Sequence, residues 1–306
     1  MNRSVDGLSQ EGEDELQEKR LRLRRQSVVR EQDRRWSWVE IDLGAIRHNI
    51  RQYRNRLSEA TRLLAVVKAD AYGHGAVRVA RCALEEGASY LAVATLDEGI
   101  ELREAGIVAP ILILSEPPEE SVSLLLAYDI MPSMYSRRFA ESYARAAALS
   151  GLPAPFHLAI NSGMNRIGVE HRDVVSFMRG IAQFPSLDCE GVFTHFATAD
   201  AGDDTDFRIQ LKRFSGSVAS LEAAGISHGI VHASNTAAGI RYPEANFDMA
   251  RLGISMYGLH ASDETRSLVD LKPAMSVHAR ITDVRKLAAG EGVSYGLKYR
   301  SMDYPM

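Results

Sequence analysis

The sequence predicts an α/β protein built as a (β/α)8 barrel of the TIM type, followed by the beginning of a separate β domain. Short apolar strands alternate with amphipathic helices about eight times between residues 38 and 258. This pattern is typical of parallel strands that are buried on both faces and covered by helices. Eight such units in about 220 residues fit a closed barrel better than an open doubly wound sheet. No GxGxxG motif opens the first unit, which argues against a dinucleotide-binding fold.

The individual elements follow from the apolar pattern. A first strand opens the stretch 38–46 and turns into a helix. Further strands are expected at 63–69, 90–95, 109–115, 131–135, 156–162, 187–197 and 229–234. Helices are expected at 76–88, 97–107, 118–129, 137–151, 171–184 and 204–225. From about residue 273, alternating residues and glycine turns follow without helices. We therefore expect a charged, flexible extension over 1–34, a barrel over 35–272 and an incomplete β domain over 273–306.

Composition limits the possible partners and compartments. The net charge of −4 gives no general attraction to nucleic acid or anionic lipid. No stretch is apolar enough to span a membrane. Cys82 and Cys189 stand far apart and outside any CxxC or metal-ligand spacing, so a reduced, cytoplasmic protein without a metal site is expected. In the extension, the acidic run at 11–15 and the basic run at 19–25 more simply satisfy each other than recruit an acidic partner.

Polar or cationic side chains stand where five of the predicted strands end. They are Lys68, Arg166, His195, Thr236 and Arg251. Taken singly, each has an ordinary structural explanation as a surface, ion-pair, core or helix-capping residue. In a (β/α)8 barrel, however, the active site lies at the C-terminal ends of the strands. Five such placements therefore predict a site there.

Lys68 is the most informative of these residues because it follows a run of apolar side chains. Loss of water in that setting favours the neutral amine, which can form a Schiff base with an aldehyde such as that of pyridoxal phosphate. Gly73 and Gly75 would free the backbone for a tight turn. Tyr72 would reach back across one helical turn to an anionic group near the lysine. Asn235 and Thr236 would begin a helix, a position compatible with bound phosphate.

The stretch VVKADAYGHG, residues 66–75, resembles the cofactor-lysine signature of alanine racemases. Other blocks resemble that family in the same order along the chain, from Trp38 to Tyr299. They are WVEIDLGAIRHNI, LAVATLDEGIELREAGI, NSGMNRIGV, THFATAD, HASNTAA, RLGISMYGL and GEGVSYG. A signature of ten residues with this many supporting blocks is highly specific.

The resemblance implies a pyridoxal-phosphate-dependent racemase that interconverts L-alanine and D-alanine and supplies D-alanine for peptidoglycan of the cell wall. It further implies a cytoplasmic homodimer with active sites shared between the subunits. Lys68 would hold the cofactor and act as the base on one face of the substrate. Tyr295 would reach into the partner's site as the base on the other face. Racemisation moves a proton from one face to the other, so two opposed bases suit it.

The resemblance also implies roles for the remaining residues. Tyr72, Asn235, Thr236, Gly253 and Ile254 would help to bind the cofactor phosphate. Arg166 would contact the substrate carboxylate and the cofactor's phenolic oxygen, and His195 would pack on the cofactor ring. Arg251 would face the pyridine nitrogen. Because arginine does not give up a proton, that nitrogen would stay unprotonated, which weakens the electron sink and favours simple return of the proton over transamination.

The sequence departs from the family pattern in two places. Ala159 stands where many members carry a carbamylated lysine, and Asn161 stands where the family often has aspartate. We therefore expect no carbamylated lysine, and Arg166 loses a neighbouring anion. The chain also stops shortly after Tyr295, where the β domain of the family continues, so a fragment or an early stop is expected.

Two alternatives stay open. A relative that acts on serine or another small amino acid would share these motifs. A barrel that binds pyridoxal phosphate without turnover would belong to a different class, although such proteins lack the AYGHG block and the VSYG tyrosine. Related barrel decarboxylases are disfavoured, because they place a glutamate at the pyridine nitrogen and Arg251 does not fit that pattern.

Overall fold

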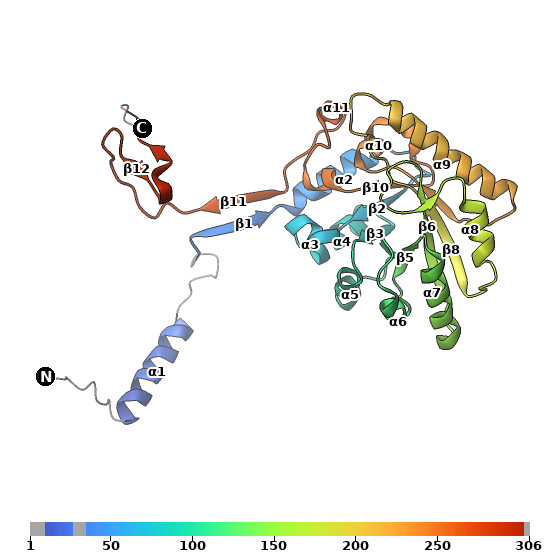
Figure 1. Ribbon diagram of the computed structural model, residues 1–306. Coiled ribbons are helices and arrows are strands. Elements are labelled where there is room, and N and C mark those ends of the chain that lie inside the picture. Colours follow the sequence, from blue (N-terminus) through green and yellow to red (C-terminus); the bar gives the residue numbers. More distant parts are fainter. Residues whose placement is uncertain (1–9, 27–34, 303–306) are drawn as a thin grey trace. The chain divides into compact units, whose positions relative to one another are not determined.

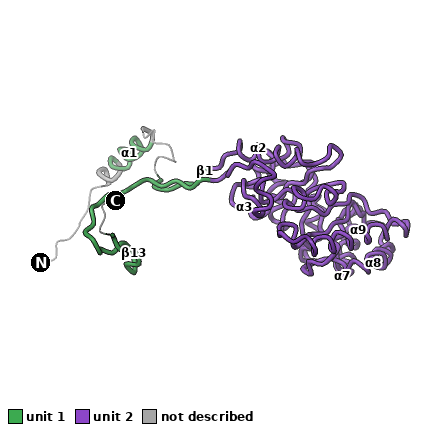
Figure 2. Tube along the Cα trace, turned by 90° about the horizontal axis from the view of Figure 1, so that it is seen from above, with its two compact units in different colours: residues 1–40, 276–306 green, residues 41–275 purple. Residues whose placement is uncertain are grey.

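A computed structural model describes residues 10–26 and 35–302 (Figure 1). The chain divides into two compact units, which Figure 2 colours separately. One unit comprises residues 41–275, and the other comprises residues 1–40 and 276–306. Much of the predicted extension 1–34, namely residues 1–9 and 27–34, lies outside the described residues. The domain boundaries drawn from the sequence stay a prediction.

The unit of residues 41–275 is built around a parallel sheet. Seven strands follow one another in chain order: β2 (Arg62–Val66), β3 (Tyr90–Val93), β4 (Ile111–Ile113), β5 (Met131–Met134), β6 (Ala154–Asn161), β8 (Leu187–Phe193) and β9 (Ile230–His232). The eighth, β10 (Met249–Leu252), pairs in parallel with β2. Backbone hydrogen bonds from Asp248 N to Val231 O (3.0 Å) and from Arg251 N to Ser234 O (3.2 Å) join the β9 and β10 ends. The predicted (β/α)8 barrel is therefore confirmed.

Helices surround the sheet, as Figure 1 shows. They are α2 (Leu43–Arg54), α4 (Ala76–Glu85), α5 (Leu96–Glu104), α6 (Val122–Ala127), α7 (Arg137–Ser150), α8 (Val174–Ile181), α9 (Thr205–Ala223), α10 (Thr236–Arg241) and α11 (Asp263–Arg266). Short 3-10 turns lie at η2 (Glu119–Ser121), η3 (Pro243–Ala245) and η4 (Ile254–Tyr257), and a two-residue strand, β7 (Val169–Glu170), pairs with β6. The helices predicted from the sequence lie within a few residues of those observed.

Local sequence signals set several helix ends. The Ser136 hydroxyl accepts a hydrogen bond from Phe139 N (3.2 Å) at the start of α7, and Gly151 ends that helix with φ +69°. A side-chain cap at the first turn and a left-handed glycine at the end satisfy backbone groups that a helix cannot pair internally. Both signals are readable in the sequence, which explains why the predicted range 137–151 is close to the helix observed.

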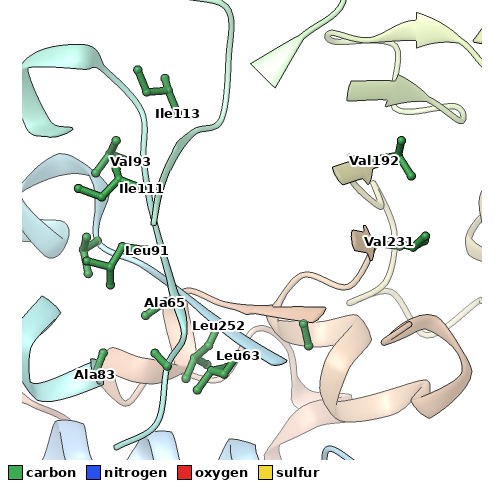
Figure 3. Packing of buried hydrophobic residues seen from close by; sticks show 14 of the residues in the cluster. Leu63, Ala65, Ala83, Leu91, Val93, Ile111, Ile113, Val192, Val231 and Leu252 are labelled. Atoms are coloured by element: carbon green, nitrogen blue, oxygen red, sulfur yellow. The ribbon is translucent and has the colours of Figure 1, made fainter. Parts of the chain in front are cut away.

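Alternate residues of the barrel strands face two different environments. Figure 3 shows part of the cluster that faces the helices, with Leu63, Leu91 and Ile111 among its labelled side chains. A second cluster holds the residues of opposite parity, Leu64, Val66, Tyr90, Ala92, Leu112, Met131 and Met249. Since neighbouring strand residues point to opposite faces, this second set fills the barrel interior. The same alternation puts Arg251 on the interior side with Met249.

The first predicted strand has a different place from the one expected. β1 (Ser37–Ile41) pairs with β11 (Met275–Ala279) in a separate two-stranded sheet, and β10 is the eighth barrel strand instead. Trp38 stacks on His278 with ring centroids 5.3 Å apart. Most residues of β1 are exposed, whereas barrel strands are buried on both faces. Its exposure thus distinguishes β1 from the buried strands of the barrel.

The unit of residues 1–40 and 276–306 holds four further described elements. They are α1 (Gln10–Gln26), η5 (Tyr295–Leu297) and an antiparallel pair, β12 (Gly292–Val293) and β13 (Tyr299–Arg300). In the sequence of α1, acidic residues precede basic ones, an order that suits the helix dipole. Among the residues that the structure describes, no helix is long and apolar enough to cross a membrane.

Candidate active site

The segment after β2 is a left-handed turn. Backbone hydrogen bonds of the helical kind cover α3 (Lys68–Gly73), but Ala69, Asp70, Ala71 and Tyr72 have φ of 50–53° and ψ of 40–49°. The predicted strand 63–69 is therefore wrong at its end, and Tyr72 does not follow an ordinary helical turn from Lys68. Left-handed backbone costs a residue with a side chain roughly 1–2 kcal/mol. Four such residues in a row store strain that neighbouring contacts must offset.

Glu98 supplies part of that support. One of its carboxylate oxygens accepts from Ala69 N (2.8 Å), and the other accepts from Ala94 N (2.7 Å). The carboxylate therefore ties the residue after Lys68 to the end of β3. At the other side of the turn, the Asp70 carboxylate accepts from Ala76 N (2.7 Å), which fixes the entry into α4. Hydrogen bonds to charged acceptors are stronger than neutral ones, so these contacts offset strain effectively.

The strain predicts an unusual response to glycine. Ala69→Gly is expected to raise the free energy of unfolding by about 0.5–1 kcal/mol, because glycine relieves the left-handed penalty at a smaller entropic cost. Ala219, exposed in α9, is the matched control. Ala219→Gly should lower the free energy of unfolding by about 1 kcal/mol. Denaturant titration of both variants checks the opposite signs. An equal loss in the two variants would contradict the account.

One cavity brings together three of the residues predicted from strand ends. Lys68, Arg166 and His195 line a cavity of about 300 Å³, which also touches Ala159 and Asn161. Lys68 follows β2, Arg166 lies in the loop after β6, and His195 follows β8. These three strands end at the same side of the barrel because they are parallel. A volume of this order is at the lower end of those that hold small ligands.

The loop that carries Arg166 is held by Asn161. The Asn161 amide nitrogen donates to Glu170 Oε1 (2.7 Å), and its carbonyl oxygen accepts from Asn165 N (3.0 Å). The Arg166 side chain itself makes no hydrogen bond or ion pair with a residue that the structure describes. Ala159 is buried in the cavity wall and offers no anion to it. Arg166 is thus available to an anionic ligand.

Arg251 is buried inside the barrel. Its Nη2 donates to Thr194 O (2.8 Å) and Ala233 O (2.9 Å), and its guanidinium lies over the ring of Phe193 at 5.6 Å. Its described partners are carbonyl oxygens and imidazole nitrogens rather than carboxylates. Burial lowers the pKa of Arg251 to about 10. It remains a cation at neutral pH, held without a neutralising acid.

His195 is a neutral imidazole at the cavity wall. Burial, together with the positive charges of Arg251, Arg166 and Lys68, lowers the pKa of His195 to about 3. Arg251 Nη2 lies 3.2 Å from His195 Nδ1. Since a guanidinium only donates, Nδ1 is the acceptor and the ring proton is on Nε2. His195 therefore presents an uncharged aromatic ring to the cavity.

Four of the residues predicted to bind phosphate follow β9 and β10, and β10 pairs with β2. The Asn235 side chain caps α10 by accepting from Ala238 N (3.1 Å), and Gly253 N donates to the Thr236 hydroxyl (2.9 Å). A Cβ at Gly253 would stand 3.5 Å from that hydroxyl and 4.0 Å from Val66 Cβ. Amides in the first helical turn have no internal partner. An anion bound at this point could accept hydrogen bonds from these amides. Ile254, the first residue of η4, follows Gly253 directly in the chain.

Tyr72 reaches the same strand end through another tyrosine. Its ring meets that of Tyr257 edge to face, with centroids 5.2 Å apart. The Tyr257 hydroxyl donates to Val66 O (2.9 Å). Partial burial raises the pKa of Tyr72, so its hydroxyl keeps its proton at neutral pH and can donate it in a hydrogen bond.

Tyr295 belongs to the other unit. It begins η5, and its side chain is fully exposed. Its assignment as the second base stays a prediction.

Sequence reasoning missed four residues that shape the site: Glu98, His157, His232 and Tyr257. The two histidines interrupt otherwise apolar strands, FHLAIN and IVH, and this was the signal available for them. In the described residues, no group of three or more histidine, cysteine, aspartate or glutamate side chains could hold a metal ion.

The structure is a parallel (β/α)8 barrel in which a lysine, two arginines and a neutral histidine lie at the C-terminal ends of the strands. These features define the class of protein as a barrel enzyme whose ligand site is positively charged. The model of the alanine racemase N-terminal domain matches residues 41–261 of this chain. The chain therefore belongs to the alanine racemase family.

Individual relatives agree with this assignment. The chain is 43% identical over 263 residues to the alanine racemase of Carboxydothermus hydrogenoformans, covering 86% of this chain and 71% of that protein. The alanine racemase structure of Clostridium difficile 630 superposes with a TM-score of 0.84 at 37% identity, covering 88% and 71% of the two chains. That of Bacillus anthracis with bound L-Ala-P gives 0.81 at 36%, covering 88% and 70%. A histidine racemase of Leuconostoc mesenteroides gives 0.79 at 27%, covering 88% and 72%.

Proposed function

We propose that this chain interconverts L-alanine and D-alanine with pyridoxal phosphate as cofactor. The observation that carries the proposal is the convergence of Lys68, Arg166 and His195 on one cavity in a member of the alanine racemase family. D-alanine supply for the cell wall and a cytoplasmic location are part of the same proposal.

The residues fit the cofactor in three respects. Lys68 offers a primary amine to an aldehyde. The capped start of α10, with Thr236 beside Gly253, suits a phosphate group. Arg251 offers a permanent donor to a ring nitrogen. When bound, pyridoxal phosphate supplies an electron sink for the electron pair that remains after loss of the substrate's α-proton.

Each side chain then has a specific task. Arg166 binds the substrate carboxylate, because it is the cavity arginine without a described partner. His195, being neutral, supports the cofactor ring without competing for its charge. Lys68 holds the cofactor and moves the α-proton on one face. Tyr295 of the partner subunit moves it on the other, which makes a homodimer necessary for turnover.

The proposal predicts that Lys68→Ala abolishes racemisation. Positioned bases contribute roughly 10²–10⁴-fold, and loss of the cofactor's covalent anchor adds to this, so a fall of at least about a thousandfold is expected. The measurement is D-alanine formed from L-alanine by the whole chain with added cofactor, with cofactor absorbance reporting occupancy. Lys212→Ala, on the exposed surface of α9, is the control and should keep full activity.

Two results would count against this function. Racemisation that survives in Lys68→Ala would remove the lysine from the mechanism. The chain could also bind the cofactor and racemise L-serine or L-histidine but not L-alanine. That result would show that its substrate is a different amino acid.

A further inference from the structure

A buried chain of three side chains crosses the barrel interior beneath the cavity. Arg251 Nη1 lies 3.0 Å from His232 Nδ1, and His232 Nε2 lies 2.9 Å from His157 Nδ1. The three residues come from β10, β9 and β6. His157 and His232 are fully buried, and Arg251 is 2% exposed. These three polar side chains are not needed for packing, because aliphatic side chains usually fill the interior of such barrels.

The hydrogen bonds of this chain can run in one direction only. A guanidinium has no acceptor, so His232 Nδ1 must accept from Arg251. The proton of neutral His232 is then on Nε2 and is donated to His157 Nδ1. Burial lowers the pKa of His157 to about 3 and holds the pKa of His232 well below its ordinary value, so both rings are neutral. The proton of His157 is on Nε2, which has no described partner.

The backbone around His157 is shaped to admit its ring. A Cβ at Gly191 would stand 2.5 Å from His157 Nδ1 and 2.8 Å from Ile230 O. The pairing of β6 with β8 shifts between Phe156 and His157, which leaves an extra residue in β8 immediately before Gly191. A bulge followed by a glycine is a common way to bring another group close to a strand. The space for the ring is thus built into the neighbouring strand.

We propose that His157 is a positioning residue that acts through His232 to fix the Arg251 guanidinium. The proposal rests on the proposed function, in which Arg251 faces the cofactor's ring nitrogen. If His232 loses the acceptor for its Nε2 proton, its ring gains by rotating or exchanging tautomer. Exchange of the tautomer would turn an N–H toward Arg251, where two donors repel, and rotation of the ring would turn a C–H toward it. Either change would remove the acceptor that fixes the guanidinium and would displace it.

A displaced Arg251 would no longer keep that ring nitrogen unprotonated. The expected consequence is a change in reaction outcome rather than a simple loss of rate. More substrate would leave as pyruvate, the oxo acid formed when the substrate's amino group exchanges with the cofactor's aldehyde oxygen. His157 would then help to decide between return of the proton and loss of the amino group.

Two substitutions separate this role from packing. His157→Asn keeps an acceptor close to the position of Nδ1, whereas His157→Leu keeps bulk and removes the acceptor. Pyruvate released per D-alanine formed is expected to rise about tenfold in His157→Leu and to stay near the wild-type value in His157→Asn. His228→Leu, at the opposite end of the barrel strands, is the control and should change nothing.

A second readout does not depend on turnover. Nitrogen NMR of cofactor-free protein labelled in its nine histidines reports each tautomer. His232 and His157 should both carry the proton on Nε2, and the His232 signals should change in His157→Leu but not in His157→Asn. If His157→Leu fails to fold, His157→Gln takes its place, because its amide cannot occupy the Nδ1 position.

Three results would overturn the proposal. They are a wild-type pyruvate ratio in His157→Leu, equal effects of the leucine and asparagine variants, and an Nδ1 proton on His232. If the wild-type chain forms no D-alanine, the proposed function fails. The NMR comparison still decides whether His157 sets the tautomer of His232.

Discussion

The free energy of unfolding is expected to fall steeply as the pH drops below about 6.5. Three buried histidines, His157, His195 and His232, have pKa values far below the ordinary one, because burial and Arg251 disfavour their charged forms. In the unfolded chain they would bind protons near pH 6.5. Below about pH 6.5 the unfolded state therefore binds protons that the folded state does not bind. The stability that these histidines contribute is fully present above about pH 6.5 and is lost as the pH falls toward about 3.

The expected effect is large. Each histidine contributes about 1.4 kcal/mol per pH unit in this window, so three give about 4 kcal/mol per unit. Typical domains have about 5–15 kcal/mol in total, so unfolding within about one to four pH units is expected. Most carboxylates titrate at lower pH, so the change in free energy between about pH 6.5 and 5 reports mainly on histidine.

Denaturant unfolding between pH 7.5 and 5, at constant cofactor loading, measures the number of protons taken up. About three are expected for the wild-type chain. His157→Asn should remove about one of them, which assigns the effect to this cluster. A free energy that is flat across the interval would mean that the buried imidazoles are not held neutral.

Gly239→Ala is expected to lower the free energy of unfolding by about 2 kcal/mol. A Cβ at this position in α10 would stand 1.9 Å from the hydroxyl oxygen of Tyr53, a fully buried side chain of α2. Forced overpacking of this kind usually costs about 1–3 kcal/mol. Because α10 begins with the proposed phosphate-binding residues, weaker cofactor binding is expected as well.

Gly216→Ala is the matched control. Gly216 lies inside α9, and nothing stands within 4 Å of the Cβ that alanine would add. Alanine there should raise the free energy of unfolding by up to about 1 kcal/mol. Removing the hydroxyl in Tyr53→Phe should recover part of the Gly239→Ala loss, although the ring carbon at 2.7 Å still crowds the Cβ. A stabilising Gly239→Ala would show that α2 and α10 are not in close contact.

The barrel could be predicted from the sequence because its signal is repeated. Apolar strands and capped helices such as α7 recur along the chain, so an error at one element does not change the architecture. β1 misled the prediction because a short alternating strand followed by a helix looks the same whether it enters the barrel or pairs elsewhere. The eighth strand was harder to find, since Arg251 interrupts its four residues.

The site was predictable where residues stand at strand ends and unpredictable where roles depend on distant pairing. Lys68, Arg166 and His195 could be placed from the positions of their strands. The meeting of His157 with His232 could not, because the two lie 75 residues apart and the bulge that admits the ring leaves no clear sign in the sequence. The left-handed backbone of residues 69–72 could not be predicted either, because their sequence, ADAY, contains no glycine that would indicate it.

The left-handed turn after Lys68 also has a consequence for library design. The usual ranking of residues for helices reverses across 69–72, where strong helix formers gain nothing and β-branched side chains would clash most. Glycine, asparagine and aspartate, which are normally avoided inside helices, are the substitutions that this backbone accepts most easily. A library built from helix propensities would therefore be enriched in destabilising variants at residues 69–72.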